Sequence, residues 1–135
     1  MIYRIDVRIT APVRNTEVAD RVADAILELF PDATVRTEPD EVIAESHSLE
    51  RLSERLHEQA ILDTARGVFF DGHSGDSFAF DLKKTAAFQG VVNFSVGEPD
   101  ELGDLHVHVR VEEPTVPEFV DHVAPPTEDG RPVSG

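Results

Sequence analysis

The residues best suited to chemistry in this sequence are cations that lie close together in a chain rich in acid. Lys83 and Lys84 are adjacent and are the only lysines. Arg4 and Arg8 share one face of an alternating segment near the start of the chain, and Arg110 lies in a second such segment. Aligned cations are suited to contacts with phosphate or another anion. For the lysine pair, a solvated surface turn is the alternative interpretation.

Histidines offer a second kind of chemistry. His106 and His108 flank a single residue of an alternating segment, which would place both imidazoles on one strand face about 7 Å apart. Two such rings could begin a metal site if a third ligand came from elsewhere. A solvated sheet face explains the same pattern, and we therefore predict neither a bound metal nor a cofactor.

A loop over 71–76 resembles a catalytic cluster only in composition. If the chain were an enzyme, Asp71, His73 and Asp76 would be its acid–base residues. The loop lacks both the glutamate that ends a calcium-binding EF-hand loop and the G-x-S-x-G pattern of a nucleophile elbow. Its two glycines are typical of a turn. The sequence therefore predicts a non-catalytic protein.

The charge of the chain limits its partners. It has 135 residues with 27 acidic and 12 basic side chains, a formal net charge of −15. Such a charge repels polyanions in dilute buffer, which excludes a generic basic nucleic-acid binder, and no DNA partner is expected. Acid excess with so few lysines is typical of proteins in molar salt, where the Debye length falls to about 3 Å. An ordinary acidic protein is the alternative.

Apolar patterning and the absence of cysteine indicate where the protein works. No apolar run approaches the roughly 20 residues of a membrane span, and the alternating first segment is unlike a signal peptide. The sequence contains no cysteine, so it offers neither a disulfide nor a thiolate metal site. We expect a cytoplasmic protein that makes no membrane contact.

Periodicity predicts an α+β fold, a mostly antiparallel sheet with helices packed on one face. Strands are expected over 2–10, 33–38, 42–44, 78–82, 91–96 and 105–111. Helices are expected over 17–30, from 48 to 69 with a break near 59–60, as a turn within 83–88, and up to 123. Asn15 or Thr16 would cap the first helix. Residues 1–124 would form a single domain, and residues 125–135 an extended tail rich in proline and glycine.

Three blocks of the sequence carry a family resemblance. They are Gln59–Arg66, Lys84–Gly90 with Asn93-Phe94, and Ala124-Pro125 with Thr127 and 129–132. Together they resemble an uncharacterised family of small archaeal proteins that is labelled RNA-binding or exosome-associated. The resemblance spans almost the whole chain and implies a fold similar to the ribosomal protein that binds 5S RNA. The chain departs from the family pattern at 103–105, where a Gly-Pro-Ile-like turn is expected, and in its acidity.

Residues and resemblance together favour a non-catalytic RNA-associated domain that works in molar salt. Its candidate contacts are Arg4, Arg8, Arg66, Lys83, Lys84 and Arg110. Convergence of these cations on one surface would strengthen this interpretation, and carboxylates around each of them would weaken it. Tyr3 is expected on the buried side of the first strand, so no exposed stacking platform is predicted.

The alternative is a protein–protein interaction module without direct RNA contact. It would be a homodimer or an accessory subunit of a larger assembly such as an RNA-processing one. Phe69 and Phe70 are adjacent, so they cannot both face the same side of one helix. One of the two rings is therefore available to a partner.

Overall fold

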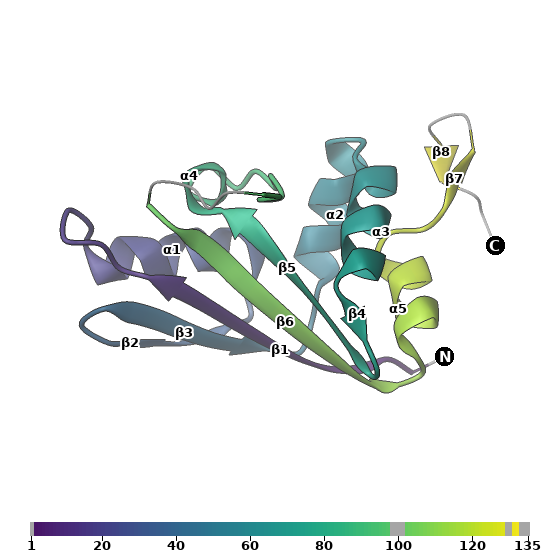
Figure 1. Ribbon diagram of the computed structural model, residues 1–135, viewed down its shortest axis with the longest axis horizontal. Helices are drawn as coiled ribbons and strands as arrows, with labels where there is room; N and C mark the ends of the chain where they lie inside the picture. The colour runs from purple at the N-terminus through teal and green to yellow at the C-terminus, as the bar shows by residue number, and fades with distance from the viewer. Residues whose placement is uncertain (1, 98–101, 129–130, 133–135) are drawn as a thin grey trace.

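Six antiparallel strands form the sheet on which the whole fold is built (Figure 1). The structure is a computed structural model that describes residues 2–97, 102–128 and 131–132. The strand order is β2-β3-β1-β6-β5-β4, so that β1 and β6 lie at the centre. The strands are β1 (Arg4–Pro12), β2 (Thr34–Thr37), β3 (Glu41–Ser46), β4 (His73–Ser74), β5 (Ser77–Lys83) and β6 (Asp104–Glu113).

The helices pack on one face of this sheet (Figure 1). They are α1 (Ala19–Leu29), α2 (Glu50–Glu58), α3 (Leu62–Asp71), the single turn α4 (Lys84–Ala87) and α5 (Val116–Val123). Strand alternation fixes which face they cover, because Val7 and Ile9 of β1 and Val107 and Val109 of β6 are buried while their neighbours are not. The predicted α+β fold with an antiparallel sheet is confirmed.

The predicted break in the second helical region is also confirmed. Helix α2 ends at Glu58, and α3 begins at Leu62. Between them Ala60 has a φ of 57°, in the left-handed region, which a continuous helix cannot accommodate. The change of direction lets both helices present an apolar side to the same core, with Leu56 and Leu62 both buried.

The strand predicted over 91–96 is wrong. The side chain of Gln59 takes both backbone groups of Val92: its Nε2 donates to the carbonyl and its Oε1 accepts from the amide, each at 2.8 Å. Those groups are then not available to a ladder. Only an isolated bridge between Leu82 and Phe94 links this segment to β5. Val92 and Phe94 alternate with polar or exposed residues, as in a strand, and this predicted a strand here. The alternation is the same whether the backbone pairs with another strand or, as at Val92, with the side chain of Gln59.

The start of α1 differs from the prediction as well. Neither Asn15 nor Thr16 caps the helix; the N-cap position is Val18, which makes no side-chain cap hydrogen bond. The preceding carboxylate, Glu17, points inward to the buried Lys84 instead. The chain before α1 is thus held by an ion pair.

Lys84 is fully buried and ties together three segments that are far apart in sequence. Its Nζ donates to the carbonyl of Pro12 at the end of β1, to Glu17 Oε1 at 3.0 Å and to the carbonyl of Leu102 at 2.7 Å. These three acceptors match the three donors of an ammonium group. Glu17 Oε1 also accepts from the amide of Arg14. The position of α4 and of the chain entering β6 therefore depends on a paired charge inside the protein.

In the segment predicted as an extended tail, two short strands pair, and residues 129–130 and 133–135 lie outside the described residues. Strands β7 (Thr127–Glu128) and β8 (Arg131–Pro132) pair antiparallel. The Thr127 hydroxyl donates to the carboxylate of Asp63 on α3, which attaches β7 to the helical layer. In the described part of the chain no helix is long and apolar enough to cross a membrane.

Replacing Lys84 by methionine should lower the free energy of unfolding by about 3–5 kcal/mol. The replacement leaves the carboxylate of Glu17 and two carbonyls buried without their donor. Urea denaturation followed by circular dichroism measures the change. Lys83→Met is the matched control, since Lys83 is only half-buried, and should stay within about 0.5 kcal/mol of wild type. Adding Glu17→Leu to Lys84→Met should recover part of the loss; a loss below about 1 kcal/mol for Lys84→Met alone would contradict the assignment.

Candidate nucleic-acid interface

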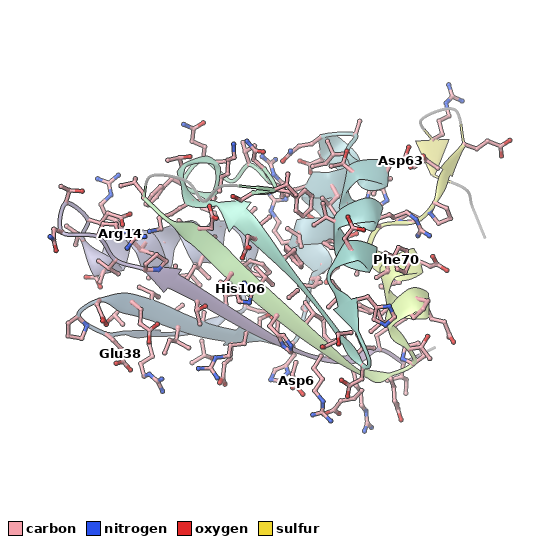
Figure 2. The ribbon with its side chains drawn as sticks, in the orientation of Figure 1. Asp6, Arg14, Glu38, Asp63, Phe70 and His106 are labelled. Atoms are coloured by element: carbon pink, nitrogen blue, oxygen red, sulfur yellow. The ribbon has the colours of Figure 1, made fainter. Side chains whose placement is uncertain are left out.

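The uncovered face of the sheet brings together the charged residues of β1 and β6. Their register sets Arg8 opposite His108 and Asp6 opposite Arg110. All four lie on the face away from the core, because the alternating apolar residues of both strands are buried. Figure 2 shows Asp6 and His106 on these strands, away from Phe70 on α3. Two segments a hundred residues apart thus form one polar surface.

A hollow of about 310 Å³ lies in this surface, and we call it the sheet hollow. It is lined by Asp6, Val7, Arg8, Glu45, Ser46, His47, His108 and Arg110. Guanidinium and imidazole groups therefore stand beside two carboxylates. Planar guanidinium groups suit phosphate oxygens because they can donate two parallel hydrogen bonds. An anion therefore fits the sheet hollow only beside Arg8, His108 and Arg110, and not beside Asp6 or Glu45.

Ion pairs occupy most of the charged groups around the sheet hollow. Arg110 lies 3.3 Å from Asp76 and 3.6 Å from Glu112, and His47 lies 3.2 Å from Asp6. These pairs are exposed, so each stabilises the protein by about 1 kcal/mol at most and can exchange with a ligand. Arg8 differs: among the residues that the structure describes, no carboxylate lies within 4 Å of its guanidinium. Arg8 is therefore the cation of this surface that is most available to an anion.

Two further predicted contacts, Arg4 and Lys83, lie outside the sheet hollow. Arg4 is at the start of β1, 3.9 Å from the carboxylate of Glu113. Lys83 is the last residue of β5 and pairs in register with Asp104. Neither lines the hollow. Of the six cations proposed from the sequence, the structure brings only Arg8 and Arg110 together.

Lys84 and Arg66 were expected at the same surface, and the structure places both elsewhere. Lys84 is buried with its donors taken, so it is not exposed to an RNA ligand in this conformation. Arg66 lies in the helical layer on α3. Its Nη1 donates to Asp121 at 2.7 Å and to the carbonyl of Ala124 at 2.9 Å, and its guanidinium lies 5.3 Å from the ring centre of Phe70. Arg66 holds α3 to α5.

The other candidate groups from the sequence do not converge either. His106 shares the sheet face with His108, but its Nδ1 lies 2.7 Å from Asp81, and no cluster able to hold a metal occurs among the described residues. In the loop before β5, His73 and Asp76 line a cavity of about 660 Å³, and Asp71 does not. Residues 75–76 of this loop connect the paired strands β4 and β5, which agrees with the turn that its glycines predicted.

A cavity of about 760 Å³ at the other end of β1 was missed from the sequence, and we call it the aromatic cavity. Tyr3 and Phe119 line it together with three histidines, His47, His57 and His122. The Tyr3 ring stacks on that of His122 with a centroid distance of 4.2 Å and an interplanar angle of 16°. Tyr3 packs against the core, on the buried side of its strand as predicted, but it is only half-buried and lines this cavity. The i, i+3 spacing of Phe119 and His122 on α5 was the signal available in the sequence.

Comparison with known proteins places the chain in a family. A UPF0201 protein of Thermococcus onnurineus is 34% identical over 135 residues, an alignment that covers 95% of this chain and 97% of that protein. The chain belongs to the UPF0201 family. The crystal structure of the UPF0201 protein from Methanococcus jannaschii superposes with a TM-score of 0.88 at 32% identity, covering 96% of this chain and 99% of that one. The archaeal resemblance is confirmed, and the likeness to the ribosomal protein stays a prediction.

A second UPF0201 relative is a longer protein. The UPF0200/UPF0201 protein of Archaeoglobus fulgidus is 36% identical over 96% of this chain, but the chain spans only 40% of its length. More than half of that protein lies outside the region that matches this chain. No family model matches the chain.

Replacing Arg66 by alanine should lower the free energy of unfolding by about 1–2 kcal/mol, because it removes two hydrogen bonds between α3 and α5 and a ring contact. Arg66→Lys keeps the charge but not the planar fork and should recover only part of this loss. Chemical denaturation measures both. Arg51→Ala removes two exposed pairs within α2, with Glu54 and Glu58, and is the control, with an expected change below about 0.5 kcal/mol. Equal effects of Arg66→Ala and Arg51→Ala would show that Arg66 does not hold the helices together.

Proposed function

We propose that this protein is a non-catalytic RNA-associated domain that contacts the RNA backbone at the sheet hollow. The observation that carries the proposal is Arg8, an exposed guanidinium without an ion-pair partner among the described residues, set opposite His108 and in the same hollow as Arg110. Phosphate is the anion that a guanidinium group recognises in RNA.

The distribution of charge supports this face over the outer side of α1. The outer side of α1 carries three carboxylates, Asp20, Asp24 and Glu28, and one arginine, Arg21. On the outer face of β1 and β6 three arginines, Arg4, Arg8 and Arg110, accompany three carboxylates, Asp6, Asp104 and Glu112. A phosphate chain therefore meets less repulsion at the uncovered face of the sheet than at α1.

The ionic strength in which the protein works decides what kind of contact can hold RNA. We infer from the net charge of −15 and the near absence of lysine that this is molar salt. Each neutralised phosphate of a single strand contributes a salt slope of about −0.7. Between 0.1 and 3 M salt one such contact loses roughly tenfold in affinity. Counterion release is then a minor contribution, and directed hydrogen bonds from Arg8 have to supply the affinity.

Replacing Arg8 by alanine should weaken RNA binding at least about tenfold and reduce the magnitude of the salt slope by about 0.7, since one phosphate contact is lost. Fluorescence anisotropy with a labelled random 12-nucleotide RNA, over 0.1–3 M KCl, measures both quantities. Arg21→Ala removes the same charge from α1 and is the matched control, with binding expected to stay as in wild type. Absence of RNA binding at every salt concentration would overturn the proposal, as would equal binding by Arg8→Ala and wild type.

A second candidate function is docking on another protein, and two observations favour it. Phe70 on α3 is 37% exposed whereas Phe69 is fully buried, so one ring of the pair does face outward. The A. fulgidus relative carries both family names, UPF0200 and UPF0201, in one chain. We propose as the alternative that this protein is an accessory subunit that binds a UPF0200 protein through the exposed side of α3.

A UPF0200 protein from the same source organism should then form a stable complex with this chain in 2 M KCl. Size-exclusion chromatography with light scattering measures the mass of the mixture and of each component alone, which also tests a homodimer. Phe70→Asp should abolish the complex because it places a charge in an apolar contact. Glu118→Lys on α5 is a surface control and should leave it intact. Separate elution of the two wild-type proteins would contradict this alternative.

A further inference from the structure

The aromatic cavity and the sheet hollow meet at one residue. His47, in the connection between β3 and α2, lines both, and its Nδ1 lies 3.2 Å from Asp6 of the sheet face and 3.1 Å from the carbonyl of Ile5. The two depressions are therefore neighbours along β1. Arg8 and Tyr3 lie five residues apart in extended chain, about 17 Å, and on opposite sides of the sheet, so an RNA strand that contacts both depressions has to span them with several nucleotides.

One wall of the aromatic cavity is a row of three rings, of which Tyr3 and His122 stack while Phe119 is tilted by 59° against Tyr3. Phe119 is buried, Tyr3 is half-buried with its ring centre 5.8 Å from that of Phe119, and His122 is exposed and stacks on Tyr3. Exposure thus increases along the series, which ends on an imidazole at the surface. A flat ring supported from behind in this way is a platform on which a base can stack, whatever its sequence.

The opposite wall carries carboxylates from α2. Glu54 and Glu58 are held by Arg51 and Arg55, at 3.0 and 2.7 Å, whereas no ion pair of Glu50 occurs within the described residues. Carboxylates repel phosphate, but they accept hydrogen bonds from the exocyclic amino groups of adenine, guanine and cytosine. The cavity is therefore suited to a base and unsuited to a phosphate, the reverse of the sheet hollow.

We propose that the aromatic cavity binds one unpaired nucleobase with an exocyclic amino group, stacked on His122, from an RNA strand that also contacts Arg8 through a phosphate farther along the strand. This inference rests on the proposed RNA association and adds to it the form of the ligand: single-stranded RNA, read by a base subsite and a phosphate subsite. Free mononucleotide shares the base chemistry, and the experiment separates the two sources.

Tyrosine fluorescence provides a direct test, because Tyr3 is the only tyrosine and the chain has no tryptophan. An eight-nucleotide oligoadenylate should quench this emission in 2 M KCl, whereas an abasic oligomer of equal length should not. Oligouridylate, which lacks an amino group, should bind more weakly than oligoadenylate. Adenosine monophosphate is titrated separately, and N-acetyltyrosinamide corrects for absorption by the nucleotides.

His122→Ala should weaken binding of oligoadenylate roughly 5- to 150-fold, the usual contribution of one stacked base, and leave binding of the abasic oligomer unchanged. His122→Phe keeps a flat ring and should restore binding. His106→Ala, on the sheet face and outside both depressions, is the control. Circular dichroism confirms that the variants are folded.

The outcomes separate this inference from the proposed function. RNA that binds, measured by anisotropy, without quenching Tyr3 and with His122→Ala equal to wild type overturns the base subsite and leaves the RNA association standing. Quenching by adenosine monophosphate but not by oligoadenylate also overturns it, because the ligand would be a free nucleotide. Failure of every RNA to bind in the anisotropy assay overturns the proposed function itself.

Discussion

The buried ammonium group of Lys84 is the interaction on which the arrangement of the chain depends. It joins the end of β1, the turn before α1 and the segment before β6 at one point. The first segment ends one central strand, the second precedes α1, and the third precedes the other central strand. The ammonium group therefore fixes the position of these three elements relative to one another at their connecting segments. A buried pair of this kind adds little net stability compared with apolar side chains of equal volume. What it adds is directional: only an arrangement that supplies three acceptors can bury the charge.

One-sided packing then determines where function can lie. The helices cover one face of the sheet, and the outer side of α1 carries a row of acid. The charged side chains of β1 and β6 lie on the other face, where cations and carboxylates are close together. Antiparallel sheets commonly tolerate water on one side, so the open face needs no covering partner for stability. The register sets Arg8 opposite His108 and so places cationic groups together. The stability of the fold does not depend on this pair of side chains.

The sequence predicted what depends on local periodicity and failed where side chains act at a distance. Alternation and helical spacing located the central strands and the break near Ala60. The same alternation predicted a strand around Val92, because nothing in the sequence reveals that Gln59 pairs with its backbone across 33 positions. Lys84 was assigned to the surface since lysine is rarely buried unless paired, and its partner Glu17 lies 67 positions away. Alternation placed Arg8 and Arg110 each on the polar face of its own strand, but that these two strands pair is a long-range fact that no local pattern shows.

The two proposed subsites would respond differently to salt. In molar salt a phosphate contact loses most of its electrostatic part, whereas stacking of a base is an apolar contact that salt does not screen. A protein with a charge of −15 therefore has reason to place its affinity in a cavity of flat rings and to use Arg8 for position. Carboxylates around that cavity are compatible with this division, since they exclude the phosphate and still accept from the base. On the proposed RNA association, the acid that argues against a generic nucleic-acid binder would instead separate a depression suited to a base from one suited to a phosphate.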